Sequence, residues 1–82
     1  GVLQKADARD PQQVAVPFAG FVHALVAEGD VVETGQAVAT VEAMKMEAAV
    51  TAPMAGTVVR LAISGAQQAE GGDLLLVLGQ PE

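Results

Sequence analysis

The segment VAVPFAGFVHALVAEGDVVETG, residues 14–35, decides the fold because the chain repeats it. The matching segment is VTAPMAGTVVRLAISGAQQAEG, residues 50–71, and the two align without a gap at an offset of 36 residues. Beyond them the second copy is one residue longer, so that GQAVATV from Gly35 matches GDLLLVL from Gly72. Two copies that are each too small to close a core predict a single domain with quasi-twofold symmetry.

Each copy shows the same order of strand and turn signals. A Pro-x-Ala-Gly motif separates two short apolar runs, and proline fits a strand end because it has no amide to donate. Glycine permits the tight reversal that follows. Val22 and Leu25 are three residues apart, as are Val58 and Leu61, and this break in alternation predicts a bulge in each copy. The expected turn residues are Pro17, Gly20, Gly29, Gly35, Pro53, Gly56 and Gly72.

The composition agrees with an all-β domain and argues against several classes of function. The hydrophobic fraction of 51% is mostly Ala and Val, which suits a thin, layered β-barrel or sandwich. The formal net charge of −6 argues against nucleic-acid binding. The apolar runs are too short to span a bilayer and no export leader is visible, so we expect no membrane contact and a cytoplasmic location.

The remaining features predict the domain limits and no catalytic machinery. Residues 1–12 are polar and aperiodic, which indicates a flexible linker before a domain at 13–79 and a tail at 80–82. His23 stands alone and is expected at the surface, and Arg60 is expected to point outward from a strand. No paired carboxylates, phosphate loop or metal-ligand spacing appears, so we expect neither a catalytic residue nor a metal site. The isolated domain is expected to be a monomer.

The stretch EAMKMEAA, residues 42–49, sets helix propensity against the repeat. Its residues are strong helix formers, but an eight-residue helix is too short to be stable on propensity alone. The repeat instead predicts strands near residues 38–41 and near Val50, joined by a two-residue turn at Met44-Lys45. Such turns favour Asn-Gly because both central residues need φ > 0, so a strained turn is expected. A break in local consistency of this kind is typical of a functional site.

The motif Ala43-Met44-Lys45-Met46 resembles the attachment motif of biotinyl (biotin carboxyl carrier) domains. Pro-Phe-Ala-Gly lies upstream and Ala-Pro-Met-Ala-Gly lies downstream, and the resemblance covers residues 14–78. It implies a flattened barrel of two four-stranded antiparallel sheets with quasi-twofold symmetry, in agreement with the repeat. It also implies biotin attached covalently to Lys45. The motif and recognition residues would be Glu42, Ala43, Met44, Met46 and Glu47.

The resemblance implies a carrier function in which the domain does not act as a catalyst by itself. A biotin protein ligase would form biotinyl-AMP, and the amine of Lys45 would attack it to form an amide. The ligase would supply the base, because an exposed lysine amine is mostly protonated at neutral pH. A biotin carboxylase domain would carboxylate the attached biotin, and a carboxyltransferase domain would pass CO2 to the acceptor. The tether would keep the intermediate at high effective concentration.

Two interpretations of the flanking residues stay open. Met44 and Met46 are either partly buried residues of the hairpin or residues that the ligase recognises and that pack beside the arm. Glu42 and Glu47 are interpreted as a solvated pair, with contact to basic residues of the partner enzymes as the alternative.

A narrower resemblance points to the carrier domain at the C-terminal end of pyruvate carboxylases. It rests on Lys-Ala-Asp at residues 5–7, Val-Ala-Val-Pro-Phe-Ala-Gly at 14–20, and EGGDLLLVL at 70–78. Some bacterial acetyl-CoA carboxylase carriers have an inserted "thumb", and no such insertion separates the two copies here, which also favours the pyruvate carboxylase type. The alternatives are a carrier domain of an acyl-CoA carboxylase, a lipoyl domain, which usually has Asp-Lys-Ala at the turn, and a structural barrel without a carrier role.

Overall fold

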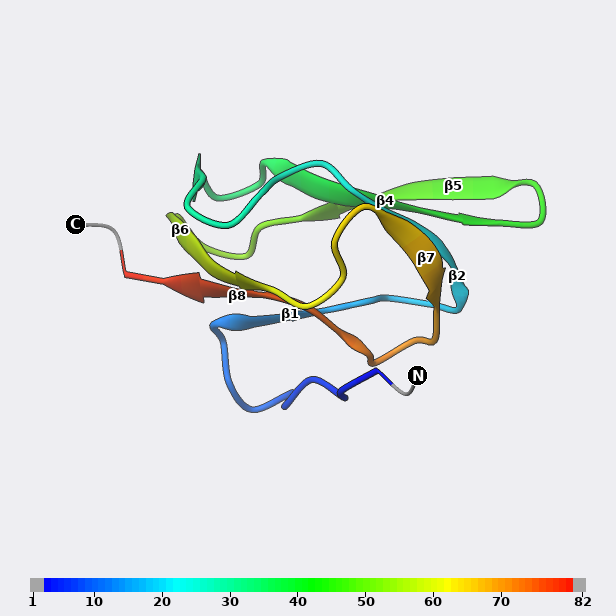
Figure 1. Ribbon diagram of the computed structural model, residues 1–82, viewed down its shortest axis with the longest axis horizontal. Coiled ribbons are helices and arrows are strands. Elements are labelled where there is room, and N and C mark those ends of the chain that lie inside the picture. The colour runs from blue at the N-terminus through cyan, green and yellow to red at the C-terminus, as the bar shows by residue number, and fades with distance from the viewer. Residues whose placement is uncertain (1–2, 81–82) are drawn as a thin grey trace.

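The computed structural model describes residues 3–80, which form eight strands and no helix (Figure 1). Apolar runs of the sequence supply most of the strands, although residues 66–69 form a strand with the sequence AQQA, and turns that contain Gly, Pro or acidic residues connect them. Among residues 3–80, no helix has the length and apolar character needed to cross a membrane. The strands are β1 (Gln13–Ala15), β2 (Gly20–Ala24), β3 (Val31–Val32), β4 (Ala37–Ala43), β5 (Met46–Thr51), β6 (Gly56–Leu61), β7 (Ala66–Ala69) and β8 (Leu74–Gly79).

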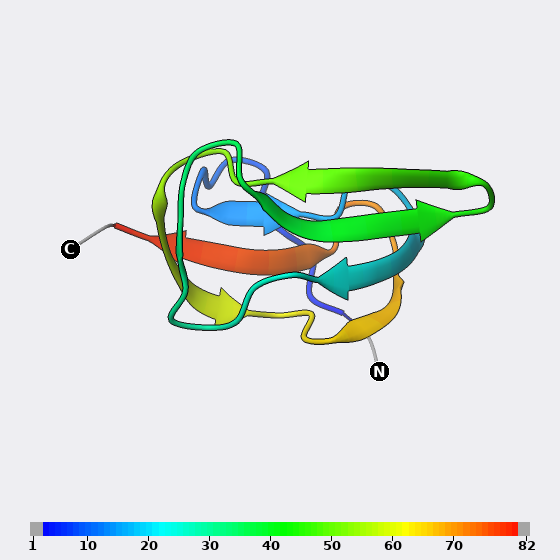
Figure 2. The ribbon, with the colours of Figure 1, turned by 90° about the horizontal axis from the view of Figure 1, so that it is seen from above.

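The strands form two four-stranded sheets in which all neighbours are antiparallel. Their orders are β1-β8-β6-β3 and β5-β4-β2-β7. The sheets stack face to face and enclose the core between them (Figures 1 and 2). The expected all-β fold is therefore confirmed, and it takes the form of a flattened sandwich rather than a closed barrel.

The two copies of the repeat are interleaved. The first copy supplies β1 to β4 and the second supplies β5 to β8, yet each sheet contains two strands from each copy. In the repeat, β1 to β4 correspond to β5 to β8. If each strand of the first sheet is replaced by its equivalent from the other copy, the strand order of the second sheet results. The quasi-twofold symmetry expected from the repeat is thus present in the topology. Neither copy can complete a sheet without the other.

Equivalent turns lock the copies together. The backbone amide of Gly35 donates to the carbonyl of Ala52, and the amide of Gly72 donates to the carbonyl of Val16, both at 2.8 Å. The φ values of Gly35 and Gly72 are +85° and +91°, in a region of backbone conformation that residues other than glycine rarely adopt. Gly35 therefore corresponds to Gly72, as the one-residue insertion in the second copy requires.

The core is built from equivalent positions on the inner faces of both sheets. Val22 in β2 and Val58 in β6 are both almost completely buried, because the strands alternate inward and outward. Strands β4 and β8 also contribute, but without strict alternation, because Val38 and Ala39 are both buried in β4 and residues 74–76 are all buried in β8. The buried pairs related by the repeat include Val14 with Val50, Val38 with Leu75, Ala39 with Leu76, and Val41 with Leu78.

The glycines of the Pro-x-Ala-Gly motifs have a different role from the one expected. Neither Gly20 nor Gly56 has a positive φ, so neither provides a tight reversal. A Cβ on Gly20 would lie 2.6 Å from the carbonyl oxygen of Glu42, and a Cβ on Gly56 would collide with the carbonyl oxygen of Gly79. The two glycines are needed because backbone passes directly over them. Pro17 and Pro53 lie just beyond the ends of β1 and β5, where no ladder amide is required.

The expected bulge appears in only one copy. The pairing of β6 with β8 shifts between Val58 and Arg60, which places both Val59 and Arg60 on the exposed side. The pairing of β2 with β4 is regular from Phe21 to Ala24, so the prediction of a bulge in the first copy is wrong. In the first copy β2 ends at Ala24, before Leu25. Leu25 is exposed and does not enter the core, so no bulge is needed to turn its side chain inward.

Residues 3–12 contact the domain, although the sequence suggested a flexible linker. The amide of Leu74 donates to the carbonyl of Gln4 at 2.7 Å, and the amide of Leu78 donates to the carbonyl of Gln12 at 2.8 Å. The ammonium group of Lys5 lies 2.6 Å from the carboxylate of buried Asp73. The boundary at residue 13 stays a prediction. The end of the expected tail, residues 81–82, lies outside the described residues.

We predict that Gly20→Ala and Gly56→Ala each lower the free energy of unfolding by about 1–3 kcal/mol, the range for overpacking a tight site. A single methyl group is sufficient because the Cβ itself meets backbone atoms that cannot rotate away. Urea denaturation measures the change. The exposed Ala19→Ser serves as the control, with an expected change within about 0.5 kcal/mol. Wild-type stability in both glycine variants would refute the close backbone approach.

Candidate functional site: the hairpin between the two copies

The hairpin of β4 and β5 is the covalent link between the two copies of the repeat. Its last paired residues are Ala43 and Met46, which leave Met44 and Lys45 as a two-residue turn. The hairpin extends beyond the rest of the sandwich along the long axis of the molecule, as Figures 1 and 2 both show. The helix-prone stretch at residues 42–49 is therefore a hairpin, as the repeat predicted.

Lys45 lies at the tip with its side chain exposed. Among residues 3–80, the ion pairs are Lys5 with Asp73 and Arg9 with Asp7, and Lys45 takes part in neither. No side-chain hydrogen bond within the described part of the chain involves its amine. The amine is thus accessible to a second protein from outside the sandwich.

The turn is strained at one residue, whereas two were expected. Met44 has φ of +56° and is the sole residue other than glycine with a positive φ among those described. Positive φ at the first central position alone is the pattern of a type II′ turn, which favours glycine there. The expectation of positive φ at both central positions is therefore wrong. The second position, Lys45, adopts an ordinary φ.

The two methionines beside the lysine are more exposed than a structural role requires. Met44 is 100% exposed and Met46 is 60% exposed. The interpretation of Met44 as a partly buried residue of the hairpin is therefore wrong. Met46 shares the alternation of Ala48 and Val50 but lies beyond the end of the core. Ala43, opposite Met46, is half-buried.

Two acidic residues stand directly opposite each other at the base of the tip. Glu42 pairs with Glu47 across β4 and β5, and both side chains are exposed. Like charges in this position destabilise a sheet. Phe21 of β2 pairs with Glu42 on the other side and is 47% exposed. Phe21 was not among the candidate residues expected from the sequence, although its outward position beside buried Val22 was a signal that could have identified it.

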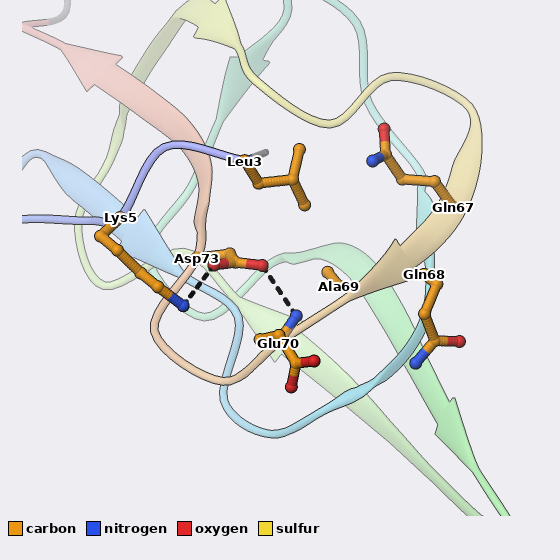
Figure 3. A pocket seen from close by; sticks show the side chains of 7 residues that line it. All are labelled: Leu3, Lys5, Gln67, Gln68, Ala69, Glu70 and Asp73. Atoms are coloured by element: carbon orange, nitrogen blue, oxygen red, sulfur yellow. Dashed lines mark hydrogen bonds and ion pairs between the residues drawn. The ribbon is translucent and has the colours of Figure 1, made fainter. Parts of the chain in front are cut away.

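A buried carboxylate, Asp73, lies away from the hairpin and holds the N-terminal segment against the sandwich through its ion pair with Lys5. Asp73 accepts from Lys5 and from the backbone amide of Glu70 at 2.7 Å (Figure 3). The hydrogen bond from Lys5 and the one from the Glu70 amide lower the pKa of Asp73 below its ordinary 3.8, against burial, which raises it. A hollow of about 250 Å³ lies beside this pair, and Lys45 is not part of its lining. Its lining residues are Leu3, Lys5, Gln67, Gln68, Ala69, Glu70 and Asp73.

The other candidate residues lie where outward strand positions place them. His23 in β2 and Arg60 in β6 are both exposed. Within residues 3–80, no group of three or more His, Asp or Glu side chains is arranged to hold a metal ion. The hairpin tip therefore remains the candidate functional site, with an accessible primary amine as its reactive group.

Most of the chain is similar to one known protein family. The family model described as "Biotin-requiring enzyme" matches residues 12–78. The mitochondrial pyruvate carboxylase of Mus musculus is 42% identical over 65 residues, which cover 78% of this chain and 6% of that protein. The pyruvate carboxylase of Bacillus subtilis (strain 168) is 38% identical over 73 residues, with 88% and 6% covered.

A solved structure gives the same assignment. The single-chain, multi-domain long-chain acyl-CoA carboxylase superimposes with a TM-score of 0.78 at 30% identity, over 96% of this chain and 8% of that chain. The chain belongs to the family of biotin-requiring enzyme domains, whose cofactor is biotin, and the resemblance stated from the sequence is confirmed. It spans a small fraction of the length of the carboxylases that it matches. The free amine of Lys45 at an exposed turn fits covalent attachment of this cofactor.

We predict that Met44→Gly raises the free energy of unfolding by about 1 kcal/mol, because glycine adopts φ near +56° without strain. The matched variant Lys45→Gly, at a position with ordinary φ, should gain nothing. Thermal and urea denaturation of both variants measure the difference. Equal effects of the two substitutions would contradict the one-sided strain of the turn.

Proposed function

We propose that Lys45 is the residue to which biotin is attached, in a carrier domain of a biotin-dependent carboxylase. The observation that carries this proposal is an unpaired, exposed lysine amine at the tip of the hairpin, within the Ala-Met-Lys-Met motif of a domain from a biotin-requiring family. When bound, biotin supplies a nitrogen that carries a carboxyl group from one active site to another.

The residues of the hairpin present the amine, and among the described residues none forms a hydrogen bond or ion pair with it. The amine of Lys45 attacks the activated carboxyl group of biotinyl-AMP, the bond to AMP breaks, and an amide forms with loss of the lysine charge. The proton leaves to a base of the biotin protein ligase, since the side chain has no partner within the described residues. A two-residue turn limits how far the amine can move, which favours a defined approach by the ligase.

The domain acts as a carrier, and the catalytic sites belong to its partners. A biotin carboxylase domain and a carboxyltransferase domain would each receive the arm in turn. Because the arm is tethered, its effective concentration at either site is of millimolar order. The opposed carboxylates of Glu42 and Glu47 suit contact with basic residues on these partners, since such contact would relieve their mutual repulsion. We place the domain in the cytoplasm, as a monomer when isolated.

Pyruvate carboxylase is the parent enzyme that the similarities favour. Two carboxylases of this name match at 42% and 38% identity over most of the chain. The carrier domain of an acyl-CoA carboxylase is the alternative, supported by the solved structure at 30% identity. Met44 and Met46, the two residues that flank Lys45 in the chain, favour biotin over a lipoyl group at Lys45.

We predict that incubation with biotin protein ligase, biotin and ATP adds one biotin to the chain, on Lys45 alone. Intact-mass and peptide mass spectrometry locate the modification. Lys5 provides an internal control, because it is the other lysine of the chain and its amine pairs with Asp73. Lys45→Arg should fold with wild-type stability and take up no biotin, because the charge remains and the reactive amine is lost.

Biotin on Lys5, or none on a folded wild-type chain, would contradict the proposal. Addition of a lipoyl group by a lipoyl ligase under the same conditions, without biotin uptake, would move the chain to the lipoyl alternative. The parent enzyme is a separate question. It is tested by joining the domain to the carboxylase and carboxyltransferase parts of each candidate and measuring carboxylation of pyruvate against that of an acyl-CoA.

A further inference from the structure

The three methionines of the chain have very different surroundings. Met44 is fully exposed at the turn and Met46 is 60% exposed on the next residue but one. Met54 is half-buried and packs against the core cluster. The chain has no cysteine, so these thioethers are its only sulfur groups. Both exposed thioethers flank Lys45 directly.

Exposure of these side chains stabilises neither the hairpin nor the sandwich. Met44 combines complete exposure with φ of +56°, a conformation that costs free energy in the free domain. Met46 lies beyond the end of the core, with the small side chain of Ala43 opposite it. A protein that encloses the hairpin tip to reach the lysine amine must also cover both thioethers. Flexible methionines are suited to such contacts because they adapt to irregular apolar surfaces.

Thioethers react with peroxides at a rate that follows their accessibility. The sulfur lone pair attacks one oxygen of hydrogen peroxide, so that a sulfur–oxygen bond forms as the O–O bond breaks. The attacked oxygen stays on the sulfur, and the other oxygen leaves as water with both hydrogens. The sulfur is oxidised by two electrons and the peroxide is reduced by two. The product, a sulfoxide, is polar and chiral where the thioether was apolar, and methionine sulfoxide reductases reverse it.

We propose that Met44 and Met46 form a peroxide-sensitive modification site that controls the acceptance of biotin at Lys45. Oxidation turns two apolar contacts beside the amine into polar ones, so a ligase surface that covers the tip binds it less well. The loss corresponds to about a tenfold or greater fall in the rate of biotin transfer at limiting chain concentration. The redox effect rests on the proposed function, whereas the order of oxidation follows from the structure alone.

The first experiment maps oxidation without reference to biotin. The chain is exposed to hydrogen peroxide for increasing times, the peroxide is removed with catalase, and the added oxygen is located by peptide mass spectrometry. Met44 should react first, Met46 next and Met54 last. Oxidation of Met54 as fast as Met44 in the folded chain would overturn the proposed site.

The second experiment measures biotin transfer by the ligase to the same samples. The ratio of initial rates before and after peroxide should fall by about tenfold or more and recover after treatment with methionine sulfoxide reductases. The double variant Met44→Leu/Met46→Leu should keep a ratio near one, whatever its starting rate, while Met54→Leu should respond as the wild type does. An unchanged ratio in a chain oxidised at both positions would overturn the proposal. If the untreated chain accepts no biotin, the proposed function is refuted, and so is the proposed effect of oxidation on biotin transfer. The order in which the methionines oxidise is decided separately by the first experiment.

Discussion

The exchange of strands between the two copies of the repeat is the constraint on which the rest of the structure depends. Each sheet takes two strands from each copy, so the backbone ladders of one copy are completed only by the other. The amides of Gly35 and Gly72 reinforce this exchange by donating across the copies at equivalent turns. One consequence is that the chain must pass from the first copy to the second through the β4–β5 hairpin.

The same constraint explains why Lys45, the proposed attachment residue, lies at the tip of the hairpin. The hairpin is held at its base by pairing of β4 with β2 and by the close approach of the Glu42 carbonyl to Gly20. Beyond this point only a few paired residues lead to the turn. The sandwich therefore provides a firm base, and the hairpin presents Lys45 away from surfaces that would hinder a large partner. The strain at Met44 and the opposed Glu42 and Glu47 are confined to the same short region, as is common where function overrides local stability.

Much of the fold could be predicted from the sequence because the repeat carries long-range information. Alignment of Val14 with Val50 and of Gly35 with Gly72 in the sequence indicates the twofold relation, the turns and the hairpin at Lys45. Features that depend on close three-dimensional approach could not be predicted. The role of Gly20 follows from a carbonyl 22 positions later in the chain, and Lys5 meets Asp73 from the opposite end of the sequence. The φ of Met44 also depends on the twist of paired strands, which residue types alone do not specify.

The central proposal is that the turn fixes the position at which a biotin protein ligase would find the amine of Lys45. It is tested most directly by exchanging the two turn residues in the double variant Met44→Lys/Lys45→Met and measuring kcat/KM for biotin transfer by the ligase. The composition, charge and exposure of the tip are kept, while the amine moves from a residue with ordinary φ to the one with φ of +56°. The account predicts a folded domain and a fall of about a hundredfold or more, the scale expected for a displaced reacting group. Transfer at the wild-type rate would show that any exposed lysine at this tip is accepted, and would contradict the account.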